Sequence, residues 1–417
     1  MPWPAAARAR AFYLRKVPSM SESKRHARLM RLPPFLRAGF RPFFLGGALW
    51  ALTVMTLWVC FLAGELDLPT AFDALAWHRH EMLFGYLGAV IAGFLLTAIP
   101  NWTGRLPMAG RGLAALAGLW LCARLALLFS APLGPLPAFL ADVGFLAALA
   151  AVAAREVLAA HNRNLPVVLV VTLLAVANGL DHAEQFGAPI PTGLGWRLGF
   201  GLVLMLVSLI GGRIIPSFTR NWLAKQGRQQ GLPTQPGRFD MATLAATAVA
   251  MVSWVALPDS PYAGALLIVA SVLQAVRLSR WSGLHTMAEP LVFILHVSYA
   301  WLPLGLLLLG ASTFSDHVPP AAALHALSAG GMASMTLAVM TRATLGHTGR
   351  DLHADGWTLA IYVLVNLGAA VRVSAPVLPV DFLGAMSLAG TLWAGAFVLF
   401  VLAYGPSMLR ARPDGRP

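Results

Sequence analysis

Twelve long stretches of mostly apolar residues follow one another along the chain, each bounded by charged residues, proline or glycine. A helix needs about 20 consecutive apolar residues to cross a bilayer, and each stretch is long enough to do so. The runs are continuously apolar, whereas the strands of a membrane barrel alternate apolar and polar residues, so the pattern favours helices over a β-barrel. The predicted spans are 43–63, 78–99, 111–131, 136–158, 165–183, 196–216, 240–257, 262–279, 288–310, 319–342, 357–375 and 382–404.

The composition agrees with an all-α integral membrane protein. Of the 417 residues, 58% are hydrophobic and only 11% are charged, and the mean hydropathy is +0.70. A soluble domain carries about 25% charged residues, so the composition excludes an ordinary soluble enzyme and a disordered chain. Cys60 and Cys122 lie in separate apolar runs and form no CxxC motif. The sequence therefore predicts no disulfide, no thiolate zinc site and no covalently attached haem.

The basic residues predict the topology. Lysine and arginine concentrate on the cytoplasmic side of membranes. With the N-terminus inside, 26 of the 30 basic residues fall in inner segments, and the outer loops carry acidic residues instead. We therefore expect both termini to be cytoplasmic. The four basic residues outside the inner segments are Arg79, Arg124, Arg197 and Arg372.

This topology divides the chain into three parts. A basic cytoplasmic arm covers 1–42, the twelve-helix domain covers 43–405, and a cytoplasmic tail covers 406–417. The arm is rich in arginine and is expected to contact anionic lipid rather than nucleic acid. Met20 and Met30 are alternatives to Met1 as the start of translation.

A spacing repeats along the chain. His80 precedes Thr103 by 23 residues, and His325 precedes Thr348 by the same distance; Thr-Gly-Arg occurs at both downstream positions. In the sixth span the same frame places Trp196 at the histidine position. Copies in spans two, six and ten predict three repeats of four helices.

Histidines near the outer ends of the spans are the candidate ligands. His80 and His325 lie about 7–11 Å inside the outer ends of spans two and ten, so the pair is a candidate for axial haem ligation. His78 lies about 200° around the helix from His80 and faces elsewhere. It is a candidate copper ligand together with His182 and His317, because Cu(II) accepts imidazole. The alternative reading is that these histidines only form hydrogen bonds between helices.

His296 is a further candidate cofactor ligand, after His80 and His325. It is predicted to lie mid-membrane in span nine, where a polar side chain is costly. The sequence contains no Gly-rich phosphate loop, HExxH or GxSxG motif, so nucleotide hydrolysis and hydrolase chemistry have no residues to carry them. No catalytic residue is predicted, and whether the chain is an enzyme stays open.

The motifs together resemble the NnrS family of bacterial haem- and copper-containing inner-membrane proteins. The resemblance rests on GFRPFF at 39–44, WHRHEM at 77–82, FLLTAIPNWTGR at 94–105, NRN at 162–164, PSFTRNWL at 216–223 and MTRATLGHTGR at 340–350. It implies haem and copper as cofactors, the bacterial inner membrane as location, and a role in the response to nitric oxide and in denitrification. It assigns no ligand residues.

A looser similarity is to the haem-copper oxidases and nitric oxide reductases, which also arrange twelve helices in three groups of four. Span ten here lacks an HxH pair and span seven has no histidine, so this similarity concerns the fold alone. The expected function is protection against nitrosative stress by a haem- and copper-binding protein, with nitric oxide or derived nitrosyl species as partners. The alternatives are a transporter or exporter of a metal complex or a nitrosated small molecule, and a sensor or assembly partner of a denitrification enzyme.

Overall fold

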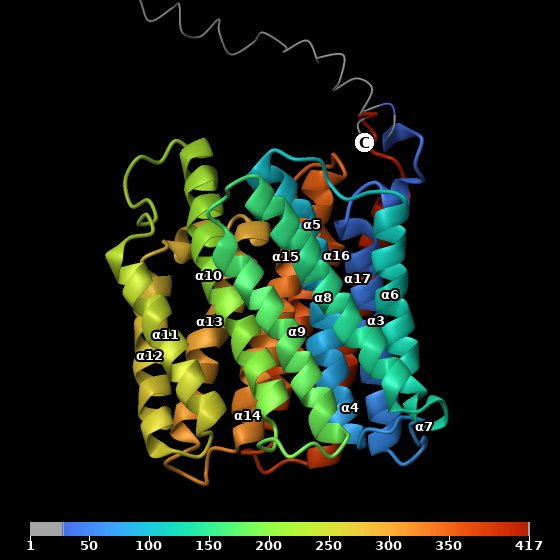
Figure 1. The fold of residues 1–417 in the computed structure, drawn as a ribbon. Coiled ribbons are helices and arrows are strands. Elements are labelled where there is room, and N and C mark those ends of the chain that lie inside the picture. The colour runs from blue at the N-terminus through green and yellow to red at the C-terminus, as the bar shows by residue number, and fades with distance from the viewer. Residues whose placement is uncertain (1–26, 28, 416–417) are drawn as a thin grey trace, which may run out of the picture.

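The computed structural model describes residue 27 and residues 29–415, and within them it is helical, with no strand. Twelve of its helical segments are long and apolar enough to cross a membrane (Figure 1). In chain order the helices are η2 (Pro34–Leu36), α3 (Phe40–Leu62), α4 (Ala74–His80), η3 (Glu81–Tyr86), α5 (Leu87–Thr103), α6 (Arg111–Leu128), α7 (Ser130–Leu133), α8 (Pro135–Ala159), α9 (Leu165–Gln185), α10 (Leu194–Lys225), α11 (Arg238–Ala256), α12 (Pro261–Ser279), η4 (Gly283–Thr286), α13 (Pro290–Ala311), α14 (Pro320–His325), η5 (Ala326–Met332), α15 (Ala333–His347), α16 (Gly356–Ser374) and α17 (Phe382–Leu409).

The twelve predicted spans are confirmed. The largest difference is at the end of α10, which continues to Lys225 although the sequence predicted an end at Pro216. Pro216 lies inside the helix, and prolines are tolerated within transmembrane helices because neighbouring groups satisfy the backbone they free. The second span begins at Ala74, before the predicted residue 78, because the Asp73 carboxylate caps the helix: it accepts hydrogen bonds from the backbone N–H groups of Leu75 and Ala76, both at 3.0 Å.

The helices form a bundle in which four spans are more deeply buried than the others. More than half of the apolar stretch is buried in α4–α5, α10, α13 and α14–α15, and less than half in each of the other eight spans. Around them the consecutive spans pack side by side, and α17 returns to pack against α3. The three spans that carry the predicted repeat are therefore all among the inner helices, where α10 contacts both η3 and η5.

Two of these inner helices are interrupted by a π-helical segment at matching positions. Segment η3 begins directly after His80, and η5 begins directly after His325. π-Helical turns are rare and are found frequently at functional sites. The third helix of the predicted repeat, α10, has no such segment, just as it has no histidine at the corresponding position.

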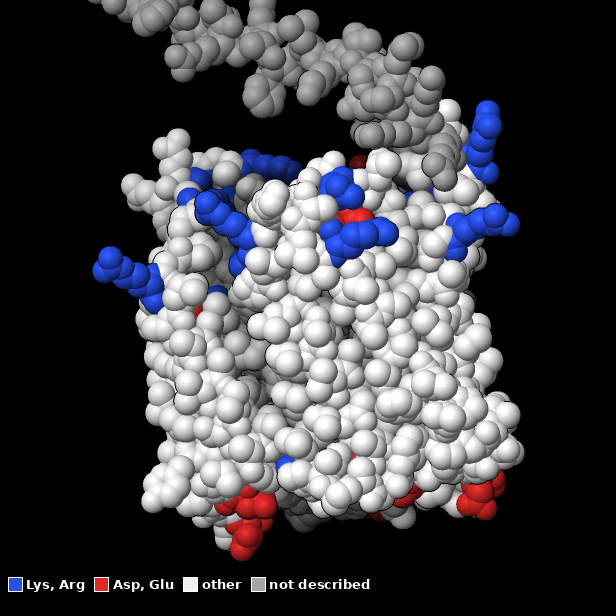
Figure 2. Space-filling model, in the orientation of Figure 1, with Lys and Arg blue, Asp and Glu red and all other residues white. Residues whose placement is uncertain are grey.

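The two ends of the bundle differ in charge. Lysine and arginine gather at one end, while aspartate and glutamate gather at the other (Figure 2). We call the end at which α4 begins the acidic end, and the end at which α5 finishes the basic end. The topology prediction rested on the same separation of basic from acidic residues. Of the predicted basic arm, residues 1–26 and 28 lie outside the described residues, as do the last two residues of the predicted tail.

Candidate metal centre

Three helices meet near the acidic end and bring together two histidines and two aspartates. His80 lies at the end of α4, Asp142 in the second turn of α8, and Asp181 and His182 near the end of α9. Nε2 of His80 is 2.6 Å from Oδ2 of Asp142, and Nδ1 of His80 is 2.7 Å from Oδ2 of Asp181. Nε2 of His182 is 3.1 Å from the same Asp142 oxygen. We call these four residues the histidine–aspartate cluster.

The cluster is fully enclosed, since all four side chains have no exposed surface. An ionised carboxylate only accepts hydrogen bonds, so His80 must donate from both ring nitrogens or one carboxyl group must hold a proton. Ionisable groups at membrane depth are costly, and four of them in one place are retained where they have a function.

A buried arginine balances the charge of the carboxylates. Arg124 of α6 forms ion pairs with Oδ1 of Asp142 and, at 2.5 Å, with Oε2 of Glu81. Trp50 donates from its indole nitrogen to the same Glu81 oxygen at 2.6 Å. Arg124 is one of the four basic residues that the topology left outside the inner segments, and its position at the cluster explains why it is there.

Aromatic rings cover the two histidines. The rings of His80 and His182 lie 4.8 Å apart at 80° to each other, and Phe72 lies edge-on to both at 5.3 Å. Phe84 packs against His80, while Phe139 and Phe186 pack against His182. This apolar cover keeps water away and strengthens every electrostatic interaction inside the cluster.

The donor atoms of the cluster fit a metal ion. Among the described residues, His80, Asp142 and His182 form a buried group whose ligand atoms lie within 4.8 Å of one another. Two imidazoles and a carboxylate suit Cu(II) and also Zn(II). Asp181, on the other ring nitrogen of His80, occupies the position of the carboxylate that commonly orients a metal-binding histidine.

Unpaired polar atoms surround the same place. Both polar atoms of the Asn178 side chain, one helical turn before His182, are buried without a hydrogen-bond partner. Nδ1 of His182 and Oδ1 of Asp181 are also buried without a hydrogen bond. Buried polar groups normally have partners, so these atoms are available to a further polar species bound at the cluster.

A second pair of histidines, His78 of α4 and His325 of α14, lies on the opposite side of α4 from the cluster. His78 stacks on Trp58, with ring centroids 4.6 Å apart, and is close enough to His325 and Arg372 for their charges to interact. Nδ1 of His325 is 2.7 Å from the carbonyl oxygen of Ala321, one turn earlier, and this contact leaves Nε2 available to bind a ligand. Nδ1 of His78 and Nη1 of Arg372 are buried without partners.

The structure thus groups the predicted ligands differently from the sequence. His80, predicted as a haem ligand, shares a carboxylate with His182, predicted as a copper ligand. His325, the other predicted haem ligand, is near His78, another predicted copper ligand. His317 lies exposed in the loop between α13 and α14 and belongs to neither group.

His296 lies in the second turn of α13. It is about 9 Å along the helix from the first residue, Pro290. Its Nε2 atom is 2.8 Å from the hydroxyl oxygen of Thr219, and its ring packs over Gly283. These contacts tie α13 to α10 near the basic end and place His296 apart from both histidine groups.

Two residues of the centre were missed by the sequence analysis. Asp142 and Arg124 each lie within an apolar stretch, where a charged residue is as costly as a histidine. The sequence therefore carried the same signal for Asp142 and Arg124, whereas the predicted ligands were histidines alone.

Comparison with known proteins identifies the family of the chain. A search of curated proteins finds no match for the chain. The family model described as NnrS protein matches residues 34–412, which include every helix of the twelve spans and both histidine groups. The chain therefore belongs to the NnrS family.

Proposed function

We propose that this chain is a copper- and haem-binding membrane protein of the response to nitric oxide, and that His80, Asp142 and His182 hold the copper. The observation that carries the proposal is the enclosed set of two imidazoles and one carboxylate in a family linked to nitric oxide. The proposed location is the bacterial inner membrane, with the acidic end facing outward. The cluster then lies near the outer surface.

The surrounding residues have separate tasks in this proposal. Asp181 accepts a hydrogen bond from Nδ1–H of His80, which fixes the plane of the ring and directs Nε2 towards Asp142, where the metal would bind. Arg124 neutralises the carboxylate oxygen of Asp142 that faces away from the histidines. The phenylalanine rings exclude water. Copper held in this way supplies one-electron redox chemistry in a dry, enclosed site.

His78 and His325 are the proposed haem ligands. They extend from α4 and α14, and haem iron commonly takes imidazole as its axial ligand. Arg372 supports this assignment, because its buried Nη1 atom has no partner and a haem propionate is a carboxylate that an arginine binds well. This pairing replaces His80 by His78, since His80 lies with Asp142 and His182 in the proposed copper site.

The test is the copper content of the purified protein. We expect His182→Ala to remove most of the bound copper, while the exposed histidine variant His353→Ala, used as the matched control, keeps it. Electron paramagnetic resonance of Cu(II)-loaded protein should show two imidazole nitrogens in the wild type and one in His182→Ala. Equal copper content and equal spectra in the two variants would overturn the copper site.

A further inference from the structure

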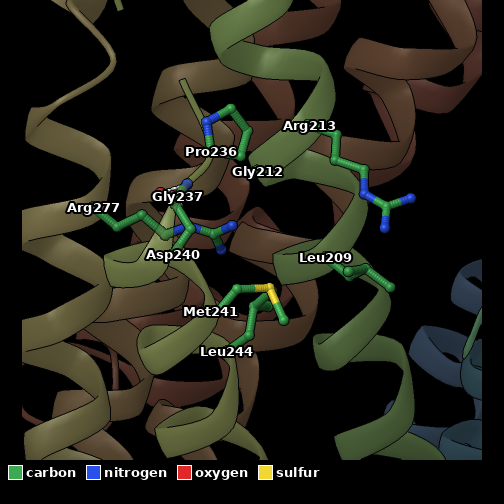
Figure 3. A pocket seen from close by; sticks show the side chains of 9 residues that line it. All are labelled: Leu209, Gly212, Arg213, Pro236, Gly237, Asp240, Met241, Leu244 and Arg277. Atoms are coloured by element: carbon green, nitrogen blue, oxygen red, sulfur yellow. Dashed lines mark hydrogen bonds and ion pairs between the residues drawn. The ribbon is translucent and has the colours of Figure 1, made fainter. Parts of the chain in front are cut away.

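A cavity of about 170 Å³ lies between α10 and α11 (Figure 3). It is nearer to the basic end of the bundle than the histidine groups are. Figure 3 shows Arg277 and Asp240 on one side of α10 and Arg213 projecting from the helix to the other side. A neighbouring cavity of about 260 Å³ shares Arg213 and Pro236 with it and also contains Arg220. We call the two cavities together the arginine groove.

The groove carries a net positive charge. Three arginines line it, and Asp240 is the only acidic residue among its lining residues. Both oxygens of Asp240 are already used: Oδ1 accepts from Nε of Arg277 at 2.9 Å, and Oδ2 accepts from the backbone N–H of Gly237 at 3.0 Å. Arg213 and Arg220 have no carboxylate partner among the described residues, so their charges are left for an anion.

Arg277 is held rigidly at the wall of the groove. It is 2% exposed, and its Nη1 atom donates to the carbonyl oxygen of Ser208 at 3.0 Å and to the hydroxyl of Tyr299 at 3.1 Å. Gly212 permits this position, since a Cβ atom there would lie 2.0 Å from Nη2 of Arg277. Nη2 itself has no hydrogen-bond partner among the described residues, so a pre-positioned donor remains available.

The other donors of the groove come from α10 and the loop before α11. Arg213 uses Nη1 to bond the Asn164 side chain at 2.9 Å, and Arg220 uses Nη2 to bond the carbonyl oxygen of Pro233. Each guanidinium has five N–H donors, so most remain free. Ser217 and Thr234 add hydroxyl groups to the same lining. Arg213 and Arg220 lie about two turns apart on α10, and their guanidinium groups with these hydroxyls are suited to phosphate, whereas Arg277 lies on the other side of α10 (Figure 3).

An apolar wall continues the groove towards the surface of the bundle. Leu209, Met241 and Leu244 line the first cavity beside the arginines. Met241 is 67% exposed, on a helix whose outer surface would lie against lipid in a bilayer. The groove therefore combines a phosphate-binding end with an apolar side open to the membrane.

We propose that the arginine groove binds the phosphate group of an anionic phospholipid, with an acyl chain along Leu209, Met241 and Leu244. Basic pockets between transmembrane helices on the cytoplasmic side bind anionic head groups in this way. The lipid would hold α10 against α11 and the loop at 226–237. The proposal is independent of the metal centre, because the groove lies near the opposite end of the bundle.

The test uses the full chain in detergent, stripped of lipid and titrated with phosphatidylglycerol, phosphatidylcholine or inorganic phosphate. The readouts are the shift in Tm and the bound lipid seen by native mass spectrometry. We expect phosphatidylglycerol to bind and to raise the Tm, and phosphatidylcholine and phosphate to have little effect. In R213Q/R220Q the affinity for phosphatidylglycerol should fall roughly tenfold or more.

The matched control is K225Q/R228Q, which removes two positive charges at the same end from exposed residues outside the groove. It should bind phosphatidylglycerol like the wild type. Equal loss of binding in both double variants would overturn the proposal, as would equal binding of phosphatidylcholine. If phosphate alone raises the Tm as much as phosphatidylglycerol, the ligand is a free anion and the lipid assignment is wrong. The comparison of ligands on the wild type needs no variant to fold.

Discussion

His78 and His80 lie two residues apart on α4 and belong to different groups of histidines on opposite faces of that helix. His80 contacts Asp142 and Asp181, on α8 and α9, whereas His78 stacks on Trp58 of α3 and is near His325. The two side chains are therefore about 200° apart around the helix axis, as the helical repeat requires. One short helix thus supplies a ligand candidate to each of two separate sites.

The two histidines should consequently be separable by mutation. We expect His80→Gln to lose copper while keeping its haem absorbance, and His78→Gln to lose haem absorbance while keeping copper. The reason is that each side chain can reach only one of the two groups. The measurement is an optical spectrum together with the metal content of the same purified samples.

The haem ligation predicted from sequence gives a different result in this experiment. If His80 and His325 hold one haem, His80→Gln removes the absorbance and His78→Gln does not. That outcome would support His80 and His325 as the haem ligands, as the repeat predicted. His182 would then have no second histidine with which to bind copper.

Asp181→Asn tests the orienting carboxylate on Nδ1 of His80. The neutral amide can still form a hydrogen bond, but it no longer selects one tautomer or raises the basicity of the ring. Loss of such a partner typically costs about 10- to 100-fold in metal affinity. Copper affinity can be measured by competition with a chelator. Glu184→Gln, which removes a charge from the same helix end outside the cluster, should bind copper as the wild type does.

The fold was largely predictable from sequence, because a bilayer demands a long apolar stretch for each helix. The largest error, at the end of α10, arose because Pro216 was taken as a helix end although neighbouring helices can support a proline at this depth. The positions of His80 and His325 at matching depth were also predictable. The π-helical segments that follow both residues were not, since no residue type signals them.

The composition of the site was only partly predictable. The sequence placed His80 and His182 at the outer ends of their spans, but depth alone does not tell which faces of the helices meet. In the structure α4 meets α8 and α9 on one face, and this contact selects His182 and Asp142 as partners of His80. The pairing across the bundle depends on tertiary packing, which the 23-residue spacing from each histidine to its threonine does not encode.

The buried arginine should be far more important for stability than an exposed one. Arg124→Gln leaves Glu81 and Asp142 enclosed without their cation, and breaking a buried pair in this way costs about 3–5 kcal/mol. Arg105, which pairs with Glu156 near the basic end and is 45% exposed, is the matched control. Its loss should cost about 1 kcal/mol or less. Thermal unfolding of both variants in one detergent measures the difference, and equal Tm values would contradict the burial argument.

Two glycines on the same inner helix should respond oppositely to alanine. A Cβ atom on Gly85 would lie 2.3 Å from Oε2 of Glu81 and 2.6 Å from Nη1 of Arg124, so Gly85→Ala must displace the buried ion pair. At Gly88 the nearest atoms, on Leu146 and Phe145, are 3.7 Å away, which is an ordinary contact.

Gly88→Ala should therefore be neutral or stabilise the protein by up to about 1 kcal/mol, because alanine is the better helix former. Gly85→Ala should lower the Tm and also weaken copper binding, since Arg124 holds the Asp142 carboxylate that faces both histidines. Measuring both quantities separates a general loss of packing from a specific effect on the cluster. A Gly85→Ala protein with reduced Tm but unchanged copper affinity would show that the ion pair supports the fold and not the metal centre.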